Sequence, residues 1–245
     1  MLHLSHQAQL NGSKKVKQRS VLVVVATMVA ALLLAPQANA EEKPTKAKKI
    51  AQASTLTSIC KPTNAVGQPP MRLSVPSKKR PHVDKTFTLK TNCGEIEISA
   101  DGVSAPLTVI SMTYLANRGY FDNSPCHRLT TQGIFVLQCG DPTASGKGGP
   151  SWYVPDENLP TGTGNIYPAG SVAMANAGPN TSGSQFFIVY QDNSRFLGAN
   201  YTLWGKVTKG LDIVKTIAAL GSNNSNGIGD GAPNQAITIE CARAN

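Results

Sequence analysis

The sequence is poor in the residues that hydrolytic and metal-dependent enzymes use. Of its four histidines, only His127 lies beyond residue 85. It contains no Gly-x-Ser-x-Gly motif, which counts against a serine hydrolase of the α/β type. Its five cysteines show no Cys-x-x-Cys or Cys/His spacing of the kind that binds structural zinc. We therefore expect neither a metal site nor another cofactor.

Acidic residues are scarce in the first third of the chain, and this scarcity explains its basic character. The formal net charge is +9. Residues 43–90 carry eleven basic residues and one acidic residue, whereas residues 91–245 carry eight basic and eleven acidic residues. The globular part is therefore slightly negative. Aromatic residues are not interleaved with the basic ones, so we expect no nucleic-acid binding.

Long apolar runs are also few, and the one that exists lies near the N-terminus. Four basic residues precede an apolar stretch from Val21 to Ala35, and Ala38-Asn39-Ala40 follows. This order is typical of a secretory signal peptide. The 15-residue stretch is short for a membrane span, which needs about 20 residues. We expect residues 1–40 to be a signal peptide cleaved after Ala40, so that the protein is exported. An uncleaved signal anchor is the alternative.

Residues 41–85 have the composition of a tether. They are rich in Lys, Pro, Thr, Ser, Gln and Ala and show little apolar periodicity. Such a segment buries too little surface to offset its ordering entropy, so we expect a basic disordered linker. A second interpretation is electrostatic contact with anionic lipid or wall polymer, made by Lys46 to Lys49 and Lys78 to Arg80.

All five cysteines lie in the part expected to be exported, where disulfides persist. Cys126 and Cys139 flank a predicted hairpin, so a bridge between them is our first expectation. Cys60 lies just ahead of the domain and has two candidate partners, Cys93 and Cys241. The sequence alone leaves this connectivity open.

Residues 86–245 show the pattern of a single mostly β domain. Apolar residues at helical spacing predict two helices, over Pro106 to Arg118 and over Leu211 to Leu220. Short strand-like runs lie between Gly-rich connections, and one of them, Glu95 to Ile98, alternates polar and apolar residues. These runs are 87–89, 95–98, 126–129, 134–138, 171–174, 185–189, 202–207 and 236–241. Many short strands and two helices predict a closed β-barrel with helices over its ends.

Three long segments resemble the cyclophilin family of prolyl isomerases. They are CHRLTTQGIFVLQCGD at 126–141, MANAGPNTSGSQFFI at 174–188 and RFLGANYTLWGKV at 195–207. The resemblance covers nearly the whole domain. It implies a closed eight-stranded antiparallel barrel capped by two helices. It also implies peptidyl-prolyl cis-trans isomerase activity on proline-containing polypeptides, without a cofactor. We expect a monomer.

The resemblance also implies the site residues. Arg128 matches the catalytic arginine, Gln138 and Gln185 match the polar floor, and the backbone of Ala175 and Asn176 matches the part that grips the substrate. The residues that match the proline pocket and the segment closing it are Phe135, Val136, Phe187, Phe196, Leu197 and Tyr201. In this interpretation the catalytic residues are Arg128, Gln138 and Asn176, and the others bind substrate.

Several positions depart from the family pattern. The stretch between Arg128 and Phe135 is two residues longer than in the best-known members, which alters the rim of the site. Val136 stands where a Met is usual, Phe196 where many eukaryotic members have Trp, and Tyr201 where they have His. These changes leave catalysis in place and put tight cyclosporin binding in doubt. A domain that binds Pro-containing segments with little turnover is the rival interpretation.

Overall fold

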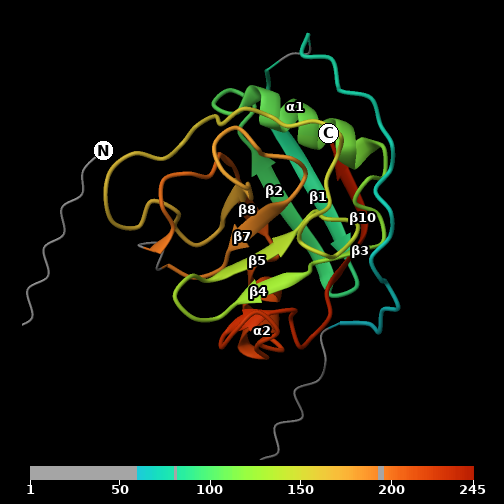
Figure 1. Cartoon of the computed structure of the whole chain (residues 1–245), viewed down its shortest axis with the longest axis vertical. Coiled ribbons are helices and arrows are strands. Elements are labelled where there is room, and N and C mark those ends of the chain that lie inside the picture. Colours follow the sequence, from blue (N-terminus) through green and yellow to red (C-terminus); the bar gives the residue numbers. More distant parts are fainter. Residues whose placement is uncertain (1–59, 80–81, 193–195) are drawn as a thin grey trace, which may run out of the picture. The chain divides into compact units, whose positions relative to one another are not determined.

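The computed structural model describes residues 60–79, 82–192 and 196–245. The expected signal peptide, Lys46 to Lys49, Arg80 and Arg195 lie outside the described residues. Figure 1 shows a curled sheet with two helices at its opposite ends. No helix among the described residues is long and apolar enough to cross a membrane.

The described part of the chain forms one antiparallel sheet of ten strands in the order β3-β10-β1-β2-β8-β6-β7-β5-β4-β9. The long strands are β1 (Lys85–Thr91), β2 (Gly94–Ala100), β8 (Leu203–Lys209) and β10 (Thr238–Ala244). The short ones are β3 (Ser124–Pro125), β4 (Arg128–Thr130), β5 (Val136–Cys139), β6 (Ser171–Met174), β7 (Phe186–Val189) and β9 (Asp230–Gly231). The prediction of a mostly β fold is confirmed.

The sheet is not the closed eight-stranded barrel that the sequence predicts. Its order is open and ends with the two-residue strands β3 and β9. The chain bends between β3 and β4, where the Cys126 amide donates to the carbonyl of Ile237 at 2.9 Å and the His127 amide donates to Gln138 at 3.1 Å. Cys126 thus bonds to the β10 side of the sheet and His127 to β5, so single hydrogen bonds replace a continuous ladder at this point.

Both predicted helices are confirmed. α1 (Pro106–Asn117) begins with Pro in the first turn, where its missing N–H leaves no bond unmade. Glu157 accepts hydrogen bonds from the amides of Leu107 and Thr108 at 3.0 and 2.8 Å, so a carboxylate from a distant loop satisfies the first turn. α2 (Leu211–Ala219) follows Gly210, whose φ of 84° suits a residue without Cβ.

Strand alternation divides the apolar side chains between the two faces of the sheet. The inner face forms the main core, in which the rings of Phe87 and Phe186 pack edge-on against Trp204 at centroid distances of 5.1 and 6.0 Å. A second, smaller cluster lies on the outer face. Its buried members are Val136, Tyr167, Ala173, Phe187, Val189 and Leu197. This second cluster gives the candidate site its apolar wall.

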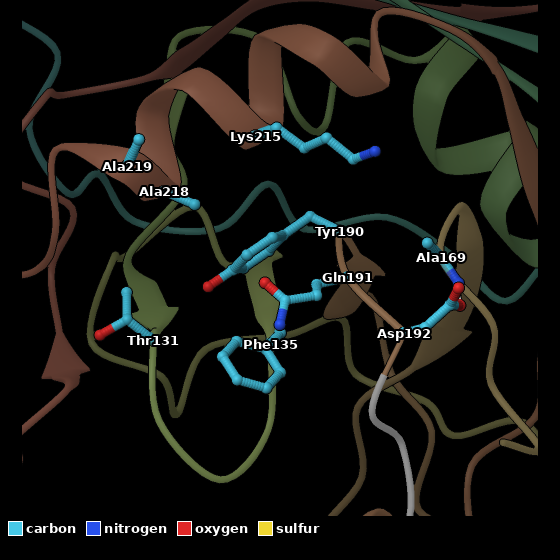
Figure 2. A pocket seen from close by; sticks show the side chains of 9 residues that line it. All are labelled: Thr131, Phe135, Ala169, Tyr190, Gln191, Asp192, Lys215, Ala218 and Ala219. Atoms are coloured by element: carbon cyan, nitrogen blue, oxygen red, sulfur yellow. The ribbon is translucent and has the colours of Figure 1, made fainter.

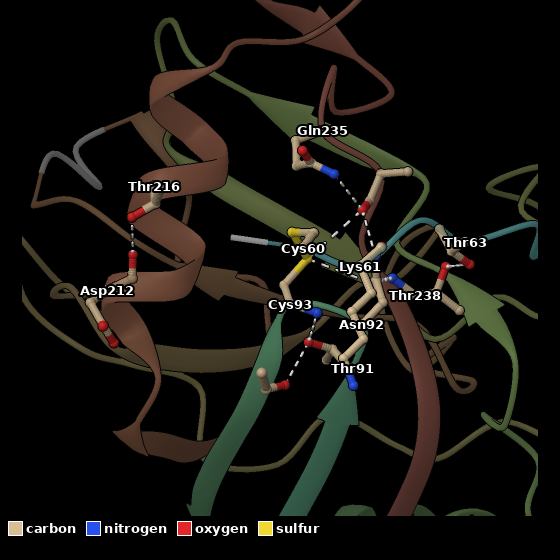
Figure 3. The surroundings of a disulfide bond; sticks show 12 residues. Cys60, Lys61, Thr63, Thr91, Asn92, Cys93, Asp212, Thr216, Gln235 and Thr238 are labelled. Atoms are coloured by element: carbon tan, nitrogen blue, oxygen red, sulfur yellow. Dashed lines mark hydrogen bonds between the residues drawn. A yellow bond between two sulfur atoms is a disulfide. The ribbon is translucent and has the colours of Figure 1, made fainter. Parts of the chain in front are cut away.

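Two disulfides are present, Cys126–Cys139 and Cys60–Cys93, and Cys241 is the free cysteine of the described residues. The first bridge confirms the expected hairpin pairing, and the second decides between the two candidate partners of Cys60. Figure 3 shows Cys60 and Cys93 beside Asn92, whose side chain donates to the carbonyl of Lys61 at 2.8 Å. The bridge therefore fixes the start of the described chain to the turn between β1 and β2.

The described residues of the expected linker make defined contacts with the domain. The Gln68 amide donates to Pro142 at 2.8 Å, and its side chain donates to Asp122 at 2.9 Å. Leu73 packs against the main core. The tether was predicted from composition, which gives no information on a disulfide or on a few long-range hydrogen bonds. These contacts hold the segment at specific points and offset the entropy that it loses on ordering.

Candidate active site

Strands β4, β5 and β7 are neighbours in the sheet (Figure 1), and a chain of polar side chains runs from Arg128 on β4 through Gln138 on β5 to Gln185, the residue before β7. Arg128 on β4 lies directly opposite Gln138 on β5, and its Nη1 donates to Gln138 Oε1 at 3.2 Å. Gln138 Nε2 donates to Gln185 Oε1 at 2.9 Å, and Gln185 Nε2 donates to the carbonyl of Gly148 at 2.9 Å. The structure thus brings together the three polar residues that the resemblance named for this part of the site.

The apolar wall lies beside this polar chain. Phe187 and Tyr201 pack edge-on with ring centroids 5.3 Å apart, and Val136 and Leu197 are buried in the same cluster. Because side chains alternate along a strand, Val136 and Gln138 share one face of β5. An apolar surface therefore adjoins a guanidinium and two amides, as a site for a proline ring and its flanking amide bonds requires.

Tyr167 supports this wall and was missed from the sequence. Its ring lies 6.3 Å from both Phe187 and Tyr201, and its hydroxyl donates to the Tyr201 carbonyl at 2.8 Å and accepts from the Tyr201 amide at 3.0 Å. Tyr167 belongs to none of the three motifs, so only tertiary structure reveals its role.

Phe135, which the resemblance assigned to the proline pocket, packs apart from the buried residues of the apolar wall. Its ring packs edge-on against Tyr190 at 6.0 Å and lies against the main core. Both rings line a cavity of about 610 Å³ whose other lining residues include Thr131, Asp192 and Lys215 (Figure 2). The Tyr190 amide donates to Phe135 at 3.1 Å, so strand alternation extends to residue 135 and turns its side chain away from Val136. Ile134 packs against the second cluster instead.

Phe196 and Leu197 differ in burial. Phe196 is 65% exposed, whereas its neighbour Leu197 is 7% exposed. Of the two residues, only Leu197 therefore contributes to the buried cluster.

Ala175 and Asn176 lie at the mouth of a second cavity, of about 420 Å³. Asn176 is oriented by its side chain, whose Nδ2 donates to the Asn200 carbonyl at 2.7 Å, and the Ala175 amide donates to the Gln185 carbonyl at 2.9 Å. Gln138, Gln185 and Tyr153 line the same cavity. The residues expected to grip the substrate backbone therefore adjoin the polar chain.

Asp230 is the main functional candidate that the sequence missed. Its carboxylate binds Arg128 through two nitrogens, with Nη2–Oδ2 at 2.7 Å and Nε–Oδ1 at 2.9 Å. The hydrogen bond from Arg128 lowers the pKa of the Asp230 carboxyl, and the same contact raises the pKa of Arg128. A half-buried arginine predicts an acidic partner, but the sequence does not say which of eleven acids it is.

His127 is a further ionisable group beside Arg128. Burial lowers the pKa of its ring below the ordinary value, so the imidazole is neutral at pH 7. No group of three or more His, Cys, Asp or Glu side chains among the described residues is placed to hold a metal ion.

Comparison with known proteins identifies the family. The family model for cyclophilin type peptidyl-prolyl cis-trans isomerases matches residues 86–244. The chain belongs to the cyclophilin family. It is 40% identical over 167 residues to a probable peptidyl-prolyl cis-trans isomerase B of Mycobacterium leprae, an alignment that covers 64% of this chain and 55% of the relative. It is 35% identical over 145 residues to the isomerase CYP18-2 of Arabidopsis thaliana, covering 56% of this chain and 83% of the relative.

A solved cyclophilin has the same fold. A crystal structure of a cyclophilin type isomerase from Cryptosporidium parvum superposes with a TM-score of 0.57 at 28% identity, covering 66% of this chain and 98% of that one. A second structure of that protein, determined in the presence of the dipeptide Ala-Pro, gives a TM-score of 0.56 at the same identity and covers 65% of this chain and 98% of that one. The chain spans about half the length of the mycobacterial relatives that it matches.

Proposed function

We propose that this cyclophilin catalyses cis-trans isomerisation of X-Pro bonds in polypeptides. The observation that carries the proposal is the placement of the Arg128 guanidinium beside the apolar wall of Val136, Phe187, Leu197 and Tyr201. Rotation about an amide bond faces a barrier of about 18–20 kcal/mol. Uncatalysed X-Pro exchange takes about 10–100 s, so a modest lowering of the barrier matters.

The chemistry needs no covalent intermediate. As the X-Pro bond twists, resonance is lost and the prolyl nitrogen becomes pyramidal with a localised lone pair. Arg128, which is always charged, donates a hydrogen bond to that lone pair. The interaction exists only in the twisted state, and an interaction made only in the transition state raises the rate.

The rest of the site holds the two sides of the rotating bond. The proline ring packs on the apolar wall, which excludes water and strengthens the hydrogen bond from Arg128. The backbone at Asn176 grips the neighbouring peptide in the 420 Å³ cavity. One side of the bond is thereby fixed while the other turns.

The test is turnover of a chromogenic X-Pro tetrapeptide by the folded domain. Arg128→Ala removes the donor, so we expect kcat/KM to fall about tenfold or more. Arg243→Ala is the matched control, because Arg243 is also paired with an aspartate, Asp122, at 3.2 Å. Thermal unfolding of both variants checks the fold. Full activity in folded Arg128→Ala would refute the assignment.

A binding module with little turnover is the second candidate function. The stretch between Arg128 and Phe135 is two residues longer than in the best-known members, and this altered rim of the site is what supports the candidate. Such a module would bind an Ala-Pro peptide with measurable affinity while leaving its cis-trans exchange rate unchanged. Exchange spectroscopy by NMR on one sample reads both quantities, and accelerated exchange excludes this candidate.

Export and assistance to the folding of exported proteins complete the proposal. The basic residues, apolar stretch and Ala-x-Ala order of residues 1–40 support export, and N-terminal sequencing of the mature protein tests it. A mature chain that begins at Glu41 is the expected result. Contact of the basic segment with an anionic envelope predicts association that is lost on raising salt. Salt-independent release would exclude that contact.

A further inference from the structure

The loop from Ser222 to Gly231 forms one side of the candidate active site. Its end, β9, pairs with β4 in the register Leu129 to Gly231 and Thr130 to Asp230. The Thr131 amide donates to the Gly229 carbonyl at 2.7 Å, so pairing continues beyond the strand. The loop lies outside all three sequence motifs that suggested the family. It places one carboxylate, that of Asp230, directly against Arg128.

The contacts of Arg128 leave a defined part of the guanidinium for a substrate. Arginine has five N–H donors. Asp230 takes the Nε donor and one on Nη2, and Gln138 takes one on Nη1. Among the described residues these contacts leave one donor on each terminal nitrogen. Asp230 therefore occupies the edge of the guanidinium formed by Nε and Nη2, and Nη1 contacts Gln138.

Arg128, which Asp230 holds, sets the direction of the whole polar chain. A carboxylate only accepts hydrogen bonds and a guanidinium only donates them. Because Arg128 donates, the Gln138 amide presents its oxygen to Arg128 and its nitrogen to Gln185. Gln185 in turn presents its nitrogen to Gly148. On the other side, Asn226 Nδ2 donates to Asp230 Oδ1 at 3.1 Å and steadies the carboxylate.

We propose that Asp230 is a positioning residue for isomerisation, which holds the Arg128 guanidinium in the orientation that donates to the prolyl nitrogen. The proposal rests on the isomerase function proposed above. The Arg128 side chain is 33% exposed, so without a partner its long side chain has room to sample other rotamers. Fixing it beforehand removes that entropy cost from the reaction.

The geometry also explains why Arg128 can still donate to a substrate while it is paired with Asp230. The carboxylate occupies the Nε side, whereas the Nη1 side remains turned toward Gln138. The ion pair is formed throughout the neutral range, since the pKa of the Asp230 carboxyl lies below its ordinary value. Asp230 therefore acts on the rate through the orientation of Arg128 and does not itself exchange a proton.

The test is a double-mutant cycle on the X-Pro tetrapeptide. Asp230→Asn keeps the shape but loses the charge and one acceptor, and we expect kcat to fall about fivefold to tenfold with little change in KM. Asp230→Glu should recover part of the loss. Because Asp230 acts through Arg128, the variant combining Asp230→Asn with Arg128→Ala should be no slower than Arg128→Ala alone.

Asp122→Asn is the matched control, since Asp122 also pairs with an arginine, Arg243, away from the site. Its activity should equal that of the unmodified chain. Full activity in Asp230→Asn, or a loss that adds to that of Arg128→Ala, overturns the positioning role while leaving the isomerase function intact. An unmodified chain without turnover overturns the isomerase function itself.

Discussion

The apolar wall and the polar rim of the site are built by different means. Part of the wall consists of strand residues, such as Phe187 and Val189 on β7, which lie two apart and share a face because of strand geometry. The rim depends on Asp230, which meets Arg128 across a separation of 102 residues. Local sequence pattern therefore dictates the strand residues of the wall, and tertiary pairing of β4 with β9 dictates the rim.

This difference implies that the two sides respond differently to perturbation. Side chains of the wall are buried and packed, so a change there costs stability and binding together. The rim is half-exposed and rests on side-chain hydrogen bonds between Arg128, Gln138 and Asp230, so a change there should alter turnover more than stability. Three comparisons test this division.

The largest expected effect is the loss of stability on removing either of the two disulfides. Replacing both Cys126 and Cys139 by Ala should lower the free energy of unfolding by about 3 kcal/mol, and replacing both Cys60 and Cys93 by Ala should lower it by about 4 kcal/mol. The difference follows from sequence separations of 13 and 33 residues. Denaturant unfolding measures both values.

Turnover should show the opposite order. The Cys126–Cys139 bridge is adjacent in sequence to both His127–Arg128 and Gln138, so its loss loosens the rim and should reduce kcat/KM several-fold. The Cys60–Cys93 bridge lies at the β1–β2 turn and should leave turnover unchanged. Equal losses of turnover from the two pairs would contradict the division between rim and scaffold.

Much of the fold follows from the sequence because its signals are local. Alternation gave the strand around Ile96, short apolar runs gave those around Val172 and Ile188, and both helices were predicted from local signals such as Pro106 at the start of the first. Closure of the barrel was predicted wrongly, since it depends on the bend at Cys126 and His127, where backbone partners change. No local pattern encodes that change.

The candidate site shows the same limit. Arg128, Gln138, Gln185 and Phe187 came from motifs and lie together as expected. Tyr167 and Asp230 lie far from those motifs and were missed. Phe135 directly precedes β5 and packs on the opposite face from its neighbour Val136, as the alternation of side chains along an extended chain predicts.

The second comparison is between alanine substitutions at two neighbouring residues, Ile134 and Phe135. Ile134→Ala trims a side chain that packs on the outer cluster, and we expect a few-fold rise in KM with a small loss of stability. Phe135→Ala trims a half-buried ring packed on Tyr190, so we expect a loss of about 1–2 kcal/mol of stability and unchanged kcat/KM. Steady-state kinetics and denaturant unfolding on the same two variants distinguish these outcomes. A larger kinetic effect from Phe135→Ala would return that residue to the proline pocket.

The smallest expected effect is a pH dependence of stability that originates beside the rim. Burial lowers the pKa of His127 below its unfolded value, and the charges facing it are Asp141, which opposes the shift, and Arg128, which adds to it. Between the folded and unfolded pKa values the unfolded chain binds more protons, so stability rises with pH in that window. From pH 7 down to pH 5 the free energy of unfolding should therefore fall by at most about 1.4 kcal/mol per pH unit.

Asp230 does not contribute in this range, because its lowered pKa places its own loss of stability at pH values below about 3.9. His127→Gln should flatten the profile between pH 5 and 7, and a slope that persists in this variant would place its origin in another group.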